Sequence, residues 1–222
     1  MTIDLIVQWI VLLFNKYRRG QIKLVNVQYA IKLALYQFYN EELAKYRYGT
    51  NDVIPETIKN YVITQAITLT TPNPNPTGGA TALLPTATYS GSLQTATNAF
   101  SKAITFFTDF GYEGTLVQPE EYADRMVSLI IPPTNEFPVA KVQSGSIFVL
   151  PAQVNRINIT YFKLPVDFNY AVSYDSDGRG FSFNAGGSTD IDINPLFSSE
   201  IAKRAAVILG IPYQNPDLDN LK

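Results

Sequence analysis

The spacing of apolar residues changes along this chain, and that change constrains the fold more than any other feature. Between residues 26 and 45, apolar side chains recur every three or four residues, which indicates one buried helical stripe. The members of this stripe are Val27, Ile31, Ala34, Leu35 and Phe38. After residue 115, apolar residues form short runs separated by Pro and Gly, which is typical of strands. The sequence therefore predicts an α+β fold.

Two helices are predicted in the first 50 residues. The first runs to about Lys16, Gly20 marks a break, and the second runs from Asn26, as N-cap, to about Lys45. Residues Leu5–Phe14 carry no charge, but a membrane crossing needs about 20 apolar residues. We therefore expect an apolar helix buried on most sides, and no membrane partner.

The middle of the chain gives a mixed pattern. The residues after Pro55 are compatible with a short helix. Ile63–Leu69 is equally compatible with a strand, because Ile and Thr favour strands. Thr70–Ser92 is rich in Pro, Gly, Asn and Thr and poor in charge. We interpret this stretch as a long extended loop that becomes ordered against a neighbouring chain. The wider segment Thr70–Phe110 is accordingly expected to contact another subunit.

Short runs of Ile, Val and aromatic residues indicate strands in the second half. These runs are Met126–Ile131, Ile147–Leu150, Arg156–Phe162, and the pair Tyr170–Tyr174 and Arg179–Phe183 around a turn at Asp175–Gly178. Glu120 and Glu121 follow Pro119 and indicate the first turn of a short helix. Several short strands at near-regular spacing predict a central antiparallel β-sandwich or small barrel.

A C-terminal helix is predicted from Ser198 or Ser199, with Gly210 and Pro212 ending it. Its inner face consists of Ile201, Ala205, Ile208 and Leu209. We expect this helix to pack with the N-terminal pair as one helical layer. The chain thus divides into a helical part at 1–50, a mixed segment at 51–115, a β region at 116–195, and a C-terminal helix and tail at 196–222. We interpret these regions as one composite domain.

The absence of Cys and His removes several kinds of catalytic site. Zinc fingers, iron–sulfur sites, Cys nucleophiles and Ser-His-Asp triads are excluded. Asp190 and Asp192 alternate, so a carboxylate hydrolase is one alternative, although a solvated strand face is the simpler interpretation. Asp175, Asp177 and Gly178 resemble the start of a calcium loop, but Gly178 comes too early for one. The residues thus show no catalytic constellation, and we expect no cofactor, metal or small-molecule substrate.

Charge is sparse and nearly balanced. Charged residues make up 16% of the chain, against about 25% in typical soluble domains, and the net charge is −2. Sparse charge suggests a surface covered by partners, and the near-neutral balance argues against a dedicated nucleic-acid binder. One basic cluster consists of Lys16, Arg18, Arg19 and Lys23. It is either a solvated turn between helices or a weak, sequence-independent contact with DNA phosphates.

Tyrosines widen the apolar stripe of the second helix. Tyr29, Tyr36 and Tyr39 either pack against the first helix or face a partner, because Tyr is favoured at interfaces. The sequence leaves these two interpretations open.

The order of motifs resembles a family of tailed-phage virion proteins. At the N-terminus, Asn15-Lys16 and Arg19-Gly20 precede the long helix Val27–Leu43. Further along come Phe137-Pro138, Ile147–Pro151, Ile159–Pro165 with Phe168 and Tyr170, the acidic run Thr189–Ile193, the helix Ser199–Leu209, and Asn215–Leu218. These motifs together resemble head-to-tail connector, ring or stabilisation proteins of podovirus-like phages of Bacteroidetes, including crAss-like phages. Thr70–Phe110 is not part of the resemblance.

The resemblance implies a structural role in the virion and no enzyme activity, so it assigns no catalytic residue. It implies a homo-oligomeric ring, commonly of twelve copies, in the neck or tail, made in the host cytoplasm and placed beside the portal and other tail proteins. DNA would pass through such a ring during genome ejection, with only transient contact. The aromatic residues Phe137, Tyr161 and Phe168 join Tyr29, Tyr36 and Tyr39 as interface candidates. The alternative is a β-sandwich module that binds a carbohydrate or receptor during host attachment.

Overall fold

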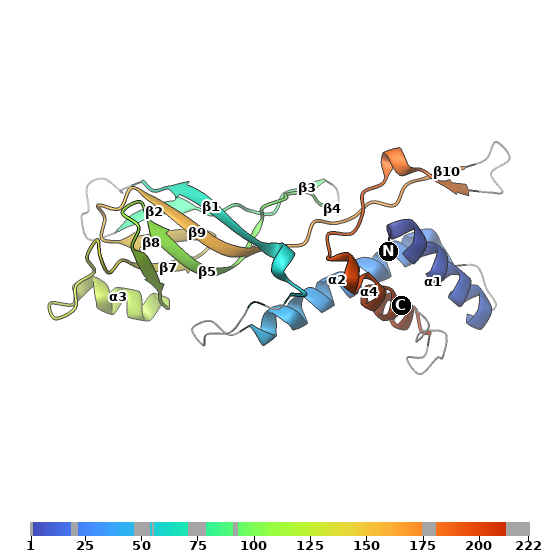
Figure 1. The fold of residues 1–222 in the computed structure, drawn as a ribbon, viewed down its shortest axis with the longest axis horizontal. Helices are drawn as coiled ribbons and strands as arrows, with labels where there is room; N and C mark the ends of the chain where they lie inside the picture. The colour runs from blue at the N-terminus through green and yellow to red at the C-terminus, as the bar shows by residue number, and fades with distance from the viewer. Residues whose placement is uncertain are drawn as a thin grey trace. The chain divides into compact units, whose positions relative to one another are not determined.

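The computed structural model describes residues 2–18, 22–46, 54, 56–70, 79–90, 93–174 and 181–211. The chain folds into two compact units. The first unit contains Met1–Asn60, Ser90–Thr95 and Pro165–Lys222, and the second contains Tyr61–Tyr89 and Ala96–Leu164. The second unit is therefore inserted into the sequence of the first, and the units do not follow the boundaries at 50, 115 and 195. Helices and strands together confirm the α+β class (Figure 1).

Three helices of the first unit pack together, as the sequence predicted. They are α1 (Ile3–Arg18), α2 (Leu24–Lys45) and α4 (Ser198–Ile208). Helix α4 contacts both α1 and α2 (Figure 1), and every residue of the predicted stripe from Val27 to Phe38 is buried. Ala202 and Ala205 of α4 are fully buried, and such small side chains allow a close approach of the helices.

The ends of two helices show how local signals compete with packing. Helix α2 begins at Leu24 after Lys23, so Asn26 lies inside the helix and is not its N-cap. Leu24 packs against the helical core, and this contact extends the helix by most of a turn. Helix α4 ends at Ile208, and the predicted stop residue Gly210 follows the C-cap Leu209 with a φ of +86°. The amide of Ile211 donates to Ala206 O and that of Gly210 to Val207 O, which closes a Schellman motif.

The second unit is built on a curled seven-stranded sheet with the order β1-β9-β5-β6-β7-β8-β2 (Figure 1). The strands are β1 (Val62–Thr68), β2 (Ala80–Leu83), β5 (Phe100–Thr108), β6 (Glu113–Leu116), β7 (Val139–Gln143), β8 (Ser146–Leu150) and β9 (Arg156–Lys163). A bridge between Thr70 and Thr81 joins the chain after β1 to β2 at the opposite edge. The sheet thus curls toward a barrel.

One strand pair departs from the predicted antiparallel arrangement. Strands β6 and β7 are parallel, whereas the other five neighbouring pairs in this sheet are antiparallel. Parallel neighbours need a crossover connection, and α3 (Pro119–Val127) supplies it. The helix starts at Pro119 with Glu120 and Glu121 in its first turn, as expected.

Shorter elements complete the chain. They are the 3₁₀ turns η1 (Lys59–Tyr61), η2 (Ala185–Gly187) and η3 (Pro195–Phe197), the pair β3 (Tyr89–Ser90) and β4 (Leu93–Gln94), and the pair β10 (Val172–Tyr174) and β11 (Phe181–Phe183). The antiparallel pairing of β10 with β11 fits the predicted hairpin. Its turn at Asp175–Gly178 lies outside the described residues.

Two stretches of the middle region fold differently from expectation. Of the two alternatives after Pro55, the strand is found, as β1. The interpretation of Thr70–Ser92 as an extended loop is wrong for its second half, because β2 joins the sheet and Ala80 and Leu84 are buried. Positions 71–78 and 91–92 lie outside the described residues. Composition misled here because a short strand with little charge resembles a loop until its partners are known.

The predicted strand Met126–Ile131 is also wrong. Its first two residues end α3, and Leu129–Ile131 form an exposed loop. A helix that starts at Pro119 runs into this stretch, and Pro132 and Pro133 cannot donate to a ladder. The apolar run is therefore neither paired nor buried within the described chain.

We predict that Gly114→Ala destabilises the second unit. A Cβ atom on Gly114 would lie 1.9 Å from Cζ of Phe106, its cross-strand partner, and that ring is fully buried and has little room to move. The expected loss in the free energy of unfolding is about 2–3 kcal/mol, measured by urea denaturation. Gly186→Ala is the control, because its nearest neighbour would lie at 3.6 Å. Equal stability of the two variants would contradict this packing.

Candidate interaction surfaces

The second unit has a connected end and a free end. The start of β1 and the end of β9 lie side by side, with Val62 opposite Phe162, and β5 begins there too, with Phe100 opposite Lys163. These strand ends lead to residues of the first unit. At the opposite end of the sheet, β5 turns into β6 through residues 109–112.

The loop after α3 returns to this free end. Because β6 and β7 are parallel, the start of β7 lies next to the start of β6. The amide of Thr115 donates to Pro138 O at 2.9 Å, which fixes the end of the loop beside β6. The loop 128–138 and the turn 109–112 therefore share one end of the sheet.

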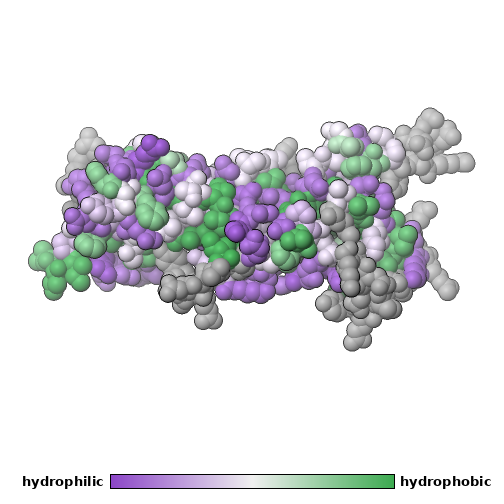
Figure 2. All heavy atoms as spheres, viewed as in Figure 1, coloured by the Kyte–Doolittle hydropathy of each residue, from purple (hydrophilic) through white to green (hydrophobic). Residues whose placement is uncertain are grey.

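This end carries a large exposed apolar surface, which we name the apolar tip. Its members are Phe110, Tyr112, Met126, Val127, Leu129, Ile130, Ile131 and Phe137. Leu129 is 98% exposed and Ile130 is 91% exposed. Figure 2 shows apolar surface gathered at the left-hand end, where Figure 1 places the end of α3 and the following loop. Single exposed apolar residues are ordinary, but a group of this size marks an interaction surface.

Hydrogen bonds shape the loop that presents the tip. The amide of Ile131 donates to Ser128 Oγ at 3.1 Å, and the amide of Phe137 donates to Thr134 Oγ1 at 3.2 Å. Side-chain hydroxyls therefore fold each half of the loop into a local turn. The apolar side chains project from a defined backbone.

Acidic residues surround the apolar tip. The exposed carboxylates on its turn, helix and loop are Asp109, Glu113, Glu120, Glu121, Asp124 and Glu136. Arg125 on the same helix forms an ion pair with Glu121 at 3.3 Å. Arg156 is also exposed at this end, where its carbonyl accepts from the amide of Asp109. The carboxylates outnumber the two arginines, so the surface is apolar at its centre and negative on balance at its edge.

A second apolar surface lies on α1 in the first unit. A groove of about 340 Å³ is lined by Val7, Gln8, Val11, Leu12, Asn15 and Tyr170, and we name it the α1 groove. Leu12 is 64% exposed. The hydroxyl of Tyr170 donates to Asp4 Oδ1 at 2.8 Å. Burial raises the pKa of Tyr170, and the hydrogen bond to the Asp4 carboxylate raises it further, so this hydroxyl stays protonated.

The basic cluster is divided by the structure. Lys16 is exposed near the C-terminal end of α1, where a positive charge suits the helix dipole. Lys23 is exposed at the start of α2 and lines, with Tyr29, a hollow of about 700 Å³. The side chain of Arg18 and all of Arg19 lie outside the described residues. Lys23, a candidate for DNA contact, and Tyr29, an interface candidate, therefore line the same hollow.

The six aromatic interface candidates separate into two groups. Phe137 is 72% exposed in the apolar tip, Tyr29 is 66% exposed on α2, and Tyr36 is half-buried. Tyr39, Tyr161 and Phe168 are buried in the chain itself and offer no free surface, so they are corrected to core residues.

Internal hydrogen bonding explains why Tyr161 stays inside. The hydroxyl of Tyr161 lies 2.8 Å from Asn98 O and 2.9 Å from Gln65 Oε1. Burial raises the pKa of Tyr161 to about 12. A tyrosine whose hydroxyl finds a partner can be buried, so tyrosine content alone did not separate core from surface.

Asp190 and Asp192 do not form a solvated strand face. Asp190 Oδ1 accepts from the amides of Ile3, at 2.8 Å, and Ile191, at 3.0 Å. Asp192 Oδ2 accepts from the amide of Val166 at 3.3 Å. Residues 190–193 are not a strand, and each carboxylate binds a different backbone segment. Asp190 thereby satisfies an orphan amide at the start of α1.

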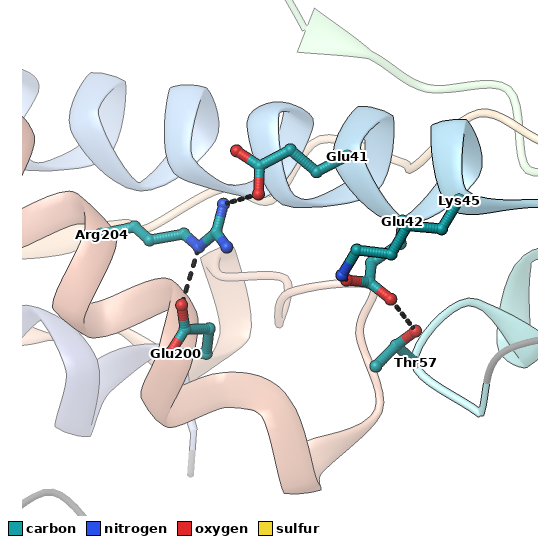
Figure 3. A network of polar contacts seen from close by, with 6 residues as sticks. All are labelled: Glu41, Glu42, Lys45, Thr57, Glu200 and Arg204. Carbon is teal, nitrogen blue, oxygen red and sulfur yellow. Dashed lines mark hydrogen bonds and ion pairs between the residues drawn. The ribbon is translucent and has the colours of Figure 1, made fainter.

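A polar network joins the helices of the first unit (Figure 3). Arg204 of α4 donates to Glu41 Oε2 of α2 at 2.7 Å and to Glu200 Oε1 at 2.9 Å. Beside it, Glu42 accepts from Lys45 and, at 2.6 Å, from Thr57 Oγ1. Each of these ionic groups has a partner, so the network is a structural clamp. In the described part of the chain, no three metal-binding side chains gather at one point.

Comparison with known proteins adds no relative. No protein-family model matches the sequence, and no curated protein matches it. None of the described helices combines the length and hydropathy that a membrane crossing requires. The resemblance to phage ring proteins therefore remains a prediction from the sequence motifs.

We predict that Glu42→Gln destabilises the first unit in a pH-dependent way. Burial raises the pKa of Glu42, but hydrogen bonds from Lys45 and Thr57 lower it more, so the pKa lies below its ordinary value. The ionised carboxylate therefore stabilises the fold at neutral pH, and that contribution disappears as the pH falls through the folded-state pKa. Near pH 7 the expected loss is about 2 kcal/mol.

Urea denaturation of both proteins between pH 7 and pH 3 measures this effect. The difference between wild type and Glu42→Gln should shrink as the pH falls. Glu56→Gln is the matched control, because Glu56 pairs with Lys59 on the surface, and it should cost less than about 0.5 kcal/mol at any pH. A pH-independent loss for Glu42→Gln would contradict the assignment.

Proposed function

We propose that this chain is a structural subunit of a ring in the neck or tail of a podovirus-like phage. In this role it connects the portal to the tail and lets DNA pass. The observation that carries the proposal is the apolar tip, which a free monomer would leave in water. The order of sequence motifs supplies the resemblance to ring proteins, and the sparse charge of 16% agrees with a covered surface.

Two different apolar surfaces support assembly into a ring. A closed ring needs a heterologous interface, in which two distinct faces of the subunit complement each other. The apolar tip lies on the second unit and the α1 groove lies on the first. A chain with two distinct apolar faces meets this requirement, whereas a symmetric dimer needs one face. Contact with the portal and neighbouring tail proteins belongs to the same proposal.

A host-attachment module is the second candidate. The stretch from Tyr161 to Phe183 is rich in aromatic residues, which suits sugar stacking by composition, but Tyr161, Phe168 and Tyr170 are buried. Phe183 of this stretch is exposed, and so are Phe110, Tyr112 and Phe137 of the tip, which form the larger aromatic group able to stack on a sugar. Glycan binding by a monomer, lost on Phe137→Ala, would favour this candidate over the ring.

The mass of the purified protein tests the ring proposal. Native mass spectrometry and negative-stain images at rising concentration should show closed rings, with a mass that is a fixed multiple of the 24.7 kDa subunit. Ile130→Asp should shift the population toward monomer by at least tenfold, because it places a charge at the centre of the apolar tip. A protein that remains monomeric at millimolar concentration would contradict the proposal.

We further predict weak and unselective DNA binding. A lumen that lets DNA pass must meet phosphates without holding them, and the net charge of −2 suits that need. Binding to duplex DNA should be undetectable at physiological salt and independent of sequence at low salt. Replacing Lys16, Arg18, Arg19 and Lys23 with Gln should abolish the residual binding, measured by fluorescence anisotropy, without changing the unfolding transition. Tight, sequence-selective binding at physiological salt would overturn the connector role.

A further inference from the structure

We propose that the apolar tip of one copy docks into the α1 groove of a second copy. This inference rests on the proposed function, because it names the contact through which neighbouring subunits would join. The tip and the groove are both apolar, both are exposed, and they lie on different units. The tip protrudes as a loop, whereas the α1 surface is hollow.

The sizes of the two surfaces agree. A fully exposed large apolar side chain presents about 150–250 Å², so the tip offers on the order of 1,000 Å², near the area that one partner contributes to a stable interface. The α1 groove has a volume of about 340 Å³. Two or three aliphatic side chains fill such a space, which suits the nearly fully exposed pair Leu129 and Ile130.

The charges at the two edges are opposite. The apolar tip is bordered by six exposed carboxylates on its turn, helix and loop, which outnumber the nearby cations Arg125 and Arg156. On α1, Lys16 follows Leu12 by four residues and so lies one turn further along the face that lines the groove. Asp4 lies at the other end of the groove, where Gln8 and Tyr170 donate to its carboxylate. The acidic edge of the tip therefore favours a register that places it beside Lys16 and away from Asp4.

The same charges disfavour other occupants. Two tips in a symmetric contact would bring two acidic edges together, which costs free energy. An anionic membrane surface would repel the same edge, although the centre of the tip is apolar. A second copy offers the complementary surface.

Cysteine cross-linking tests the contact cleanly, because the chain contains no cysteine of its own. The double variant Leu12→Cys with Ile130→Cys is oxidised at the concentration where assembly is measured. Because the contact is head-to-tail, we expect a ladder of dimers, trimers and longer species on non-reducing gels. The yield should exceed at least tenfold that of the control pair Leu12→Cys with Leu83→Cys. Leu83 is 81% exposed and lies on β2, opposite Ser146 near the other end of the sheet.

Single variants separate the possible partners. A mixture of the Leu12→Cys and Ile130→Cys proteins should give one dimer band and no ladder. A dimer from Ile130→Cys alone would indicate a tip-to-tip contact. A faster-migrating monomer of the double variant would indicate a contact within one copy. Flotation of the wild-type protein with phosphatidylglycerol vesicles, lost on Ile130→Asp, would indicate a membrane. Each of these three results would overturn the proposal.

Mass and cross-linking together distinguish this inference from the ring proposal. Rings with a ladder support both. Rings without a ladder leave the ring role standing and overturn the tip-to-groove contact. A ladder without closed rings supports the contact and contradicts the ring. A monomer without a ladder overturns both.

Discussion

The first unit depends on the burial of α4 against helices from the opposite end of the sequence. An eleven-residue helix is marginal in water, so its stability comes from the apolar face that it presents to α1 and α2. Fully buried alanines on α4 allow the helices to approach closely. Polar contacts stabilise the same packing. Arg204 donates to Glu41 on α2, and the Asp190 carboxylate accepts from an amide at the start of α1. The two ends of the chain are thus held together by both apolar and ionic contacts.

The second unit is inserted into the sequence of the first and is joined to it through strand ends. The strand ends that connect to the first unit lie at one end of the curled sheet, so among the described residues no link to the first unit leaves the other end. The parallel crossover through α3 returns the chain to that free end, where Leu129–Ile131 are exposed. Sheet topology, and not local preference, therefore gathers the apolar tip from a turn, a helix end and a loop.

The candidate surfaces illustrate why sequence patterns located some residues and missed others. Phe137 and Tyr29 were predicted at an interface and are exposed. The strongest feature, Leu129–Ile131, was interpreted as a strand, because an apolar run normally belongs to a core. A signal was present, since a helix start at Pro119 and the pair Pro132-Pro133 leave that run no room to form a strand. The composition of this run favours a buried strand, whereas its position between a helix and two prolines leaves it exposed.

The sequence by itself determined the elements whose signals are local. The stripe of α2, the start of α3 and the end of α4 at Gly210 follow from periodicity, helix-start preferences and the left-handed backbone of glycine. Tertiary structure decided everything that depends on a distant partner. Tyr39 and Tyr161 are buried by distant neighbours, Asp190 accepts from an amide at the start of α1, and β2 pairs within the sheet. The physical reason is that burial and hydrogen bonding are set by neighbours in space, which a linear pattern does not contain.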